Sequence, residues 1–180
     1  KGAGRGDNLT ATLASEPLHL SVSAANVKQH NLRAARAFKP AAAGSESGPV
    51  IPGEVIGSSA YDARNEDLRL AWRGQQQLIE FTAGQQRIGF EGFPNQRMDM
   101  TGNQGRQLNL RYSASFESLR LKGRLWRQTV EHAMDMGPDR FFYGFGMPML
   151  TEATSEGLQL QAEADLREDA QLRLGAERQT

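Results

Sequence analysis

Apolar and polar residues alternate strictly along several segments of this chain. Along residues 108–116, every even position is apolar or aromatic or an alanine, and every odd position is Asn, Arg or Ser. Successive side chains of a β-strand point to opposite faces, so this pattern predicts a strand with one apolar and one polar face. No segment of comparable length shows the 3.6-residue apolar period of an amphipathic helix. The pattern therefore predicts an all-β fold.

The same alternation recurs along the chain. It is found in the segments 9–13, 18–24, 68–72, 79–83, 119–125, 158–166 and 172–176. Together with 108–116, these segments predict eight strands, each with an apolar face and a polar face; the apolar faces are rich in Leu and Ala, and several of the polar faces carry charged residues.

The connections between these segments alternate between short and long. Short turns are predicted at 15–17, 74–77, 117–118 and 167–170, and long links at 28–65, 88–106 and 131–156. Loops longer than about 15 residues are uncommon in compact soluble domains. Outer-membrane barrels have short periplasmic turns and long extracellular loops. The sequence therefore predicts an antiparallel up-and-down segment of a transmembrane β-barrel, located in the outer membrane with its long links outside.

The amino-acid composition agrees with a β-barrel segment and argues against membrane-spanning helices, a nucleic-acid partner and cysteine-based sites. The chain is 38% hydrophobic and has no run of the roughly 20 apolar residues that a membrane-spanning helix needs. Only every second residue of a barrel strand must be apolar, so a barrel looks almost soluble in composition. Lys and Arg number 21, as do Asp and Glu, a balance that does not favour a nucleic-acid partner. Cysteine is absent, which excludes disulfides and Cys-ligated zinc within this sequence.

Two other all-β structures also fit an alternating pattern. A soluble sandwich, such as a carbohydrate-binding module, has alternating strands, but its core usually contains more Val, Ile and aromatic residues than this Leu- and Ala-rich face. A stand-alone eight-stranded barrel would require 9–13 to pair with 172–176. Trp72 and Phe116 each stand beside a short turn, as expected for the aromatic girdle of a membrane barrel. Trp126 falls on the polar face, where we expect it to pack in the lumen.

The sequence carries no catalytic signature. It contains no nucleophile elbow and no phosphate-binding glycine loop before a helix. No nucleophile, base and orienting group can be assembled from its residues, so we expect that the protein is not an enzyme.

The methionines suggest a metal site. All six occur in three Met-x-Met pairs, and all lie in the two later long links. Thioethers are soft ligands that select Cu(I), and imidazole also suits copper. His132 and Met134 are one residue apart, so in an extended segment both side chains project to the same side. We predict that His132 and Met134 bind metal; weaker candidates are Met98, Met100, Met136, Met147 and Met149. The alternative is that these methionines only pad a loop.

Four segments in the second half of the chain form a recognisable series: 92–101 (GFPNQRMDMT), 107–112 (QLNLRY), 131–136 (EHAMDM) and 146–149 (GMPM), the last followed by Thr151 and Glu152. These segments resemble TonB-dependent receptors, in particular their copper-receptor branch. Their order and spacing carry the resemblance, which is strongest over residues 54–180.

The resemblance implies a 22-stranded barrel, closed by an N-terminal plug and driven by a TonB-type energising complex of the inner membrane. Residues 1–180 would then form part of the barrel wall, with the plug and the TonB-contacting region outside this chain. In the copper branch, a Cys and a Met of the plug and a His-x-Met of the barrel hold the metal; only the last maps here, onto His132 and Met134. The implied partners are outer-membrane lipid and a copper ion. Related receptors carry siderophores, cobalamin or other metal chelates, which remain alternative substrates.

Overall fold

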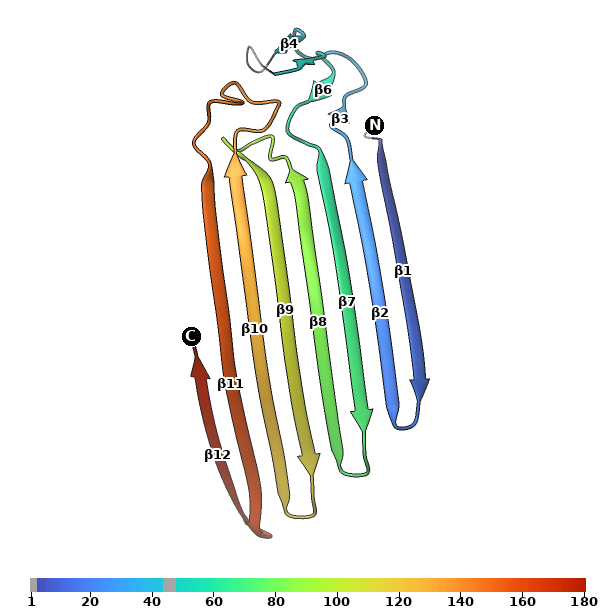
Figure 1. Ribbon diagram of the computed structural model, residues 1–180, viewed down its shortest axis with the longest axis vertical. Coiled ribbons are helices and arrows are strands. Elements are labelled where there is room, and N and C mark those ends of the chain that lie inside the picture. Colours follow the sequence, from blue (N-terminus) through green and yellow to red (C-terminus); the bar gives the residue numbers. More distant parts are fainter. Residues whose placement is uncertain (1–2, 44–47) are drawn as a thin grey trace.

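Eight long strands form one antiparallel sheet in the computed structural model, which describes residues 3–43 and 48–180 (Figure 1). The sheet order is β1-β2-β7-β8-β9-β10-β11-β12, so each long strand pairs with the next long strand along the chain. All eight predicted strands and the all-β fold are confirmed. The strands are β1 (Gly4–Ser15), β2 (Leu18–Gln29), β7 (Tyr61–Arg73), β8 (Gln77–Glu91), β9 (Asp99–Ser115), β10 (Leu119–Asp135), β11 (Met149–Arg167) and β12 (Ala170–Gln179).

The topology is up-and-down, with the two kinds of connection at opposite ends of the sheet (Figure 1). Residues 16–17, 74–76, 116–118 and 168–169 form the short turns at one end, and residues 30–60, 92–98 and 136–148 form the long connections at the other. The predicted alternation is confirmed, but all three long links are shorter than predicted. Strands β9, β10 and β11 continue into the last two. The prediction ended these strands too early because their loop ends do not alternate regularly between apolar and polar residues.

The first long connection contains four short strands that the sequence did not predict. They are β3 (Leu32–Arg33), which pairs with β6 (Val55–Ile56), and β4 (Ala42–Ala43), which pairs with β5 (Val50–Ile51). Ile51 and Val55 are among the few buried apolar side chains. A two-residue strand is too short to show a period, so no sequence pattern could have indicated these elements.

The apolar face of the long sheet is organised in rows that run across the strands. One row joins directly opposed residues of six neighbouring strands: Leu20, Leu70, Phe81, Leu110, Leu125 and Leu158. Such rows occupy the halves of the strands next to the short turns. The side chains remain accessible: Leu110 is 40% exposed and Leu125 is 50% exposed. An apolar band of this extent marks a surface that contacts lipid or another protein.

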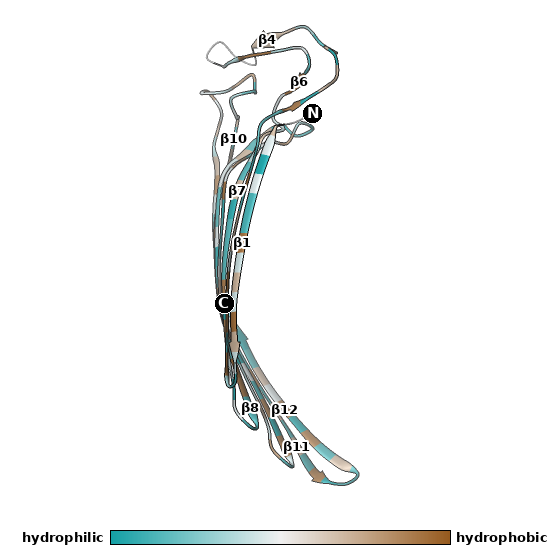
Figure 2. Cartoon of the chain, turned by 90° about the vertical axis from the view of Figure 1, so that its right-hand side faces the viewer, coloured by the Kyte–Doolittle hydropathy of each residue, from teal (hydrophilic) through white to brown (hydrophobic). Residues whose placement is uncertain are grey.

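The described residues form a single layer. Their accessible surface is 12835 Å², whereas a compact monomer of 19.8 kDa exposes roughly 8,600 Å². Figure 2 shows this layer from its edge as a curved sheet with the long connections at its top end. A sandwich buries its apolar face against a second sheet, and within the described residues no second sheet covers this one. The soluble-sandwich alternative is therefore not supported.

The sheet is also open at both edges. Strands β1 and β12 are its two ends and do not pair with each other in the described part of the chain. The stand-alone closed barrel, which required pairing between 9–13 and 172–176, is therefore not observed. Across residues 3–43 and 48–180 there is no helix long and apolar enough to span a membrane.

The polar face carries ion pairs and one packed tryptophan. Arg120 forms ion pairs with Glu163 at 3.2 Å and with Asp165 at 2.9 Å. Trp126 lies on this face as predicted, directly opposite Gly157 of β11. A Cβ atom on Gly157 would lie 2.2 Å from Cζ2 of Trp126, so the absence of a side chain there makes room for the ring. The guanidinium of Arg124 lies 5.1 Å from the centre of the same ring, within cation–π range.

Candidate functional site

The two predicted metal ligands lie in a strand and not in a loop. His132 and Met134 lie near the end of β10, where they still pair with residues of β9 and β11. The sequence analysis predicted the end of this strand too early, because β10 beyond Leu125 shows no regular alternation of apolar and polar residues. The prediction that both side chains project to the same side is confirmed, because the two residues are two positions apart in a strand and therefore lie on one face. This is the polar face, since both share the parity of Arg120 and Arg124.

The register brings three methionines into one row across neighbouring strands. Met134 of β10 lies directly opposite Met149 of β11 on one side and Met100 of β9 on the other. Directly opposed residues in an antiparallel sheet have Cβ atoms about 4.5–5.5 Å apart. Sequence spacing alone could not have shown that these three residues, from three separate Met-x-Met pairs, come together.

A β-bulge in β9 makes this row possible. Ala133 pairs with Gly102, whereas Met134 pairs with Met100, so Thr101 is an extra residue in β9. Without the extra residue, Thr101 would lie opposite Met134 and Met100 would fall on the other face. Bulges commonly redirect a side chain in this way near functional sites.

His132 is held by a neighbour on β9. Its Nδ1 lies 3.1 Å from Oδ1 of Asn103, its direct cross-strand partner. If Nδ1 carries the proton and donates it to this oxygen, Nε2 has a free lone pair. Metal-binding histidines are usually oriented by such a hydrogen bond from the nitrogen that does not bind the metal. Asn103 therefore fits the role of a positioning residue for His132.

The remaining three methionines lie at the same end of the sheet, outside the strands. Met98 immediately precedes β9, Met136 immediately follows β10, and Met147 stands two residues before Met149. Met147 is 84% exposed and Met149 is 58% exposed. The 136–148 connection folds back onto its own start: a Cβ atom on Gly146 would lie 2.8 Å from Cγ of Met136. All six methionines thus gather around the loop ends of β9, β10 and β11.

A hard-ligand metal site is not found in the part of the chain that the structure describes. No group of three or more His, Cys, Asp or Glu side chains converges there in a way that could hold a metal ion. The donors that do come together on this face, the thioether sulfurs and His132, are a set that favours a soft ion such as Cu(I) over Zn²⁺, which prefers thiolate, imidazole and carboxylate.

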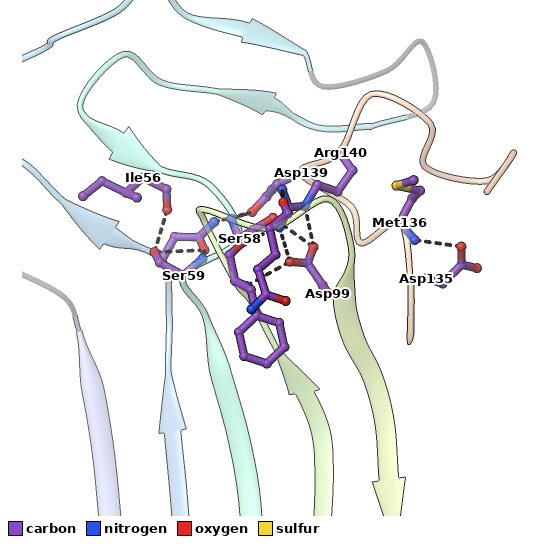
Figure 3. Close-up of polar contacts among 11 residues, drawn as sticks. Ile56, Ser58, Ser59, Asp99, Asp135, Met136, Asp139 and Arg140 are labelled. Atoms are coloured by element: carbon purple, nitrogen blue, oxygen red, sulfur yellow. Dashed lines mark hydrogen bonds and ion pairs between the residues drawn. The ribbon is translucent and has the colours of Figure 1, made fainter. Parts of the chain in front are cut away.

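Next to the methionines, a buried ion pair fastens two long connections together (Figure 3). Asp99, the first residue of β9, is fully buried, and Arg140 of the 136–148 connection donates to both of its carboxylate oxygens at 2.6 and 3.0 Å. Arg140 also donates to the backbone carbonyls of Phe93 and Gln96. One guanidinium thus joins the 136–148 connection to the 92–98 connection.

The carboxylate of Asp99 is kept charged by its partners. Burial by itself would raise its pKa, but hydrogen bonds from Arg140, from the backbone N–H of Phe93 and from the hydroxyl of Ser58 outweigh burial, and the pKa is lowered below its ordinary value. A hydrogen bond to the charged form of an acid favours that form. Asp99 therefore remains an anion at neutral pH despite its complete burial.

A second acid, Asp139, ties the first long connection to the same cluster (Figure 3). Its Oδ2 accepts hydrogen bonds from Nδ2 of Asn31 and from the backbone N–H of Ser58, each at 2.7 Å. Asn31 in turn accepts a hydrogen bond from the backbone N–H of Ser59 at 3.0 Å. The three long connections are thereby held as one unit above the sheet.

Two glycines allow this close packing. A Cβ atom on Gly92 would lie 2.3 Å from the backbone of Ser58, and one on Gly137 would lie 2.4 Å from Oδ2 of Asp99. Ser58 itself is 2% exposed and has a φ of 54°, a left-handed conformation that is uncommon for residues other than glycine. This cluster was not predicted from the sequence. Its only signal was the presence of Asp99, Asp139 and Arg140 within long links, and a single sequence does not distinguish such residues from solvated loop residues.

The structure is therefore an open, antiparallel up-and-down β-sheet with one polar and one apolar face, which is the architecture of a segment of a β-barrel. No protein-family model matches the chain, and no curated protein sequence matches it. Among solved structures, the chain is similar to a structure titled "Copper transporter OprC", with a TM-score of 0.67 and 19% sequence identity. The likeness covers 99% of this chain and 27% of that chain, so this chain spans about a quarter of the length of that transporter. At this level of identity the likeness is one of fold.

Proposed function

We propose that this chain forms part of the wall of an outer-membrane transport barrel, with its apolar face against lipid and its polar face toward the lumen. The observation that carries this proposal is the exposed apolar band on a single-layer, up-and-down sheet. Along β9 and the first residue of the turn that follows it, the band covers residues 108–116, close to the nine to eleven or so residues that a tilted strand needs to cross a bilayer. The likeness in fold to a copper transporter supports the same assignment.

We further propose that the cargo is copper and that the barrel is of the TonB-dependent kind. The support is the row Met100, Met134 and Met149 beside His132, all on the face that we assign to the lumen. Thioether sulfurs and one imidazole nitrogen form a donor set for Cu(I). The row lies next to the long connections, so an ion arriving from outside would meet Met147 and Met149, the most exposed of the six, before the half-buried Met134.

In this proposal the residues of the chain bind and orient the cargo and catalyse no reaction. His132 would present Nε2 while Asn103 holds Nδ1, and Met134 would present its sulfur from the next position on the same face. Further ligands would come from Met100 and Met149 or from parts of the protein outside this chain. The loop cluster around Asp99 and Arg140 would keep the entrance in one conformation.

The test is metal analysis of the full-length protein and of the double variant His132→Ala, Met134→Ala. We expect the wild type to bind Cu(I) and the double variant to lose most of that binding, while the barrel still folds because both side chains lie off the apolar band. Equal copper content in the two proteins would remove both residues from the site. Absence of copper binding in both would make a siderophore or another metal chelate the better substrate.

A further inference from the structure

Toward the long connections, the face that is apolar near the short turns becomes polar, and three arginines lie there on neighbouring strands. Arg64 of β7 lies directly opposite Arg87 of β8. Arg106 of β9 lies opposite Gln85, which is two residues closer to the short turns than Arg87. All three residues are exposed. Like charges placed directly opposite each other on two strands destabilise a sheet, so this arrangement gains from a bound anion.

Two of these arginines have no acidic partner within the described residues. Arg64 forms an ion pair with Glu66. The guanidiniums of Arg87 and Arg106 face neutral amides instead. When the amide of Gln85 is turned, its oxygen accepts from Arg87 Nε and Nη2 at 2.7 and 3.0 Å; when the amide of Gln104 is turned in its place, its oxygen accepts from Arg106 at 3.0 and 2.6 Å. In either arrangement the neighbouring side chain is a neutral amide, which leaves the charge of the guanidinium unneutralised.

The position of the arginines relative to the apolar band suggests the partner. Arg106 stands two residues from Leu108, which belongs to the band on β9, and it lies on the same face. Arg87 stands four residues from Ala83 on β8, with Gln85 between them. A lipid whose chains covered the band would place its headgroup at this height. Guanidinium groups recognise phosphate through paired N–H donors.

We propose that Arg87 and Arg106, with Arg64 beside them, bind the phosphate of a phosphorylated glycolipid in the outer leaflet. The inference rests on the proposed function, which places this face against lipid and the long connections outside. The other charged groups on this face limit the site. Glu131 of β10 lies opposite both Gln104 and Glu152 of β11, and these two carboxylates repel an anion. On β7, Glu66 lies opposite Gln85 and is paired with Arg64. The phosphate site is therefore centred on Arg87 of β8 and Arg106 of β9.

The experiment measures lipid binding to the full-length protein in detergent, with lipid A carrying two phosphates as the probe and dephosphorylated lipid A as its counterpart. We expect the wild type to prefer the phosphorylated form. The double variant Arg87→Gln, Arg106→Gln should bind it roughly 10- to 30-fold more weakly, since each basic residue near a charged membrane surface contributes about fivefold. Each single variant should show an intermediate loss.

Two variants serve as controls. Arg111→Gln removes a charge from β9 on the opposite face and should leave the lipid preference unchanged. Glu131→Gln removes a neighbouring negative charge and should strengthen binding of the phosphorylated lipid. Equal binding of the two lipids by the wild type, or an unchanged preference in the double variant, would overturn the inference. Insertion into phosphatidylcholine vesicles, measured in parallel, tests the proposed function separately: failure of the wild type to insert would overturn that function itself.

Discussion

Arg140 and Asp99 form a buried ion pair in which Nη2 of the arginine lies 2.6 Å from Oδ1 of the aspartate. Arg140 is 15% exposed at its side chain and Asp99 is 0% exposed. The pair joins the first residue of β9 to the 136–148 connection, two positions that are far apart in sequence. Because the methionine row begins at the residue after Asp99, the pair also fixes the end of β9 next to the candidate metal site.

Replacing Arg140 with Gln should open the loop cluster. The change leaves the carboxylate of Asp99 buried without its counter-ion, which costs about 3–5 kcal/mol for a buried pair. We expect the loss to appear locally, as faster proteolysis of residues 92–98 and 136–148, while the strands stay protected. Arg127→Gln is the control, because Arg127 and Glu156 are 61% and 55% exposed and 3.8 Å apart. Equal cleavage rates in wild type and Arg140→Gln would show that the pair does not hold the connections.

The same pair should make the loop cluster sensitive to acid. The pKa of Asp99 is lowered in the fold from its ordinary value of 3.8, so folding favours the charged form. The stabilisation is therefore fully present above that value and is lost as the pH falls through the lower, folded pKa. Hydrogen exchange of the 92–98 and 136–148 amides should be well protected near neutral pH and lose protection only below about pH 4. The variant Asp99→Asn should show no such acid step; an identical step in both would assign it to another group.

The strands were predictable because one face of each is apolar over several residues. The segment 119–125 alternates between apolar and polar residues without a break, and it forms the first half of β10. The second half was missed since Arg127, Thr129 and Glu131 continue the same face with polar residues. Pairing with β9 and β11 continues there through backbone hydrogen bonds, which leave no trace in side-chain polarity.

The candidate site was predictable only in part, for a similar reason. His132 and Met134 could be grouped because their spacing is local. The register that sets Met100 and Met149 beside Met134 depends on strand pairing and on the bulge at Thr101. The ion pair of Asp99 and Arg140 depends on how two long connections fold. Such long-range relationships are not encoded in the spacing of residues within one segment.

The apolar band should be intolerant of charge if it faces lipid. Arginine in place of Leu110 or Leu121 should cost on the order of 2–4 kcal/mol of folding stability near the middle of a bilayer. The same change at Ser113, which lies on the polar face of β9, should be mild. Folding of the three variants of the full-length protein into lipid vesicles, followed by denaturant titration, gives the comparison. Equal tolerance at Leu110 and Ser113 would contradict the assignment of the faces.

If the chain is part of an outer-membrane barrel as proposed, the two ends of the sheet should lie on opposite sides of the membrane. Single cysteines at Asn95 and Phe145, which are exposed in two long connections, should react with a membrane-impermeant thiol reagent on intact cells. Cysteines at Ser118 and Asp169, in the short turns, should react only after the outer membrane is opened. Labelling of the turn positions alone on intact cells would invert the proposed orientation.

The methionine row can be tested by comparing two adjacent residues of β11. Met149 lies opposite Met134 on the polar face, whereas Leu150 lies opposite Ala133 on the other face. Both are well exposed, at 58% and 78%, so neither replacement should disturb packing. Met149→Ala removes one thioether from a Cu(I) site and should weaken Cu(I) binding, because soft sulfur donors supply much of the affinity for this ion. Leu150→Ala removes a similar apolar volume but no donor, so it should leave binding unchanged. Titration of each full-length variant with Cu(I), against a chelator of known affinity, measures the difference, and Zn²⁺ should show little response in either case. An equal effect of both replacements on Cu(I) binding would mean that the row does not supply ligands.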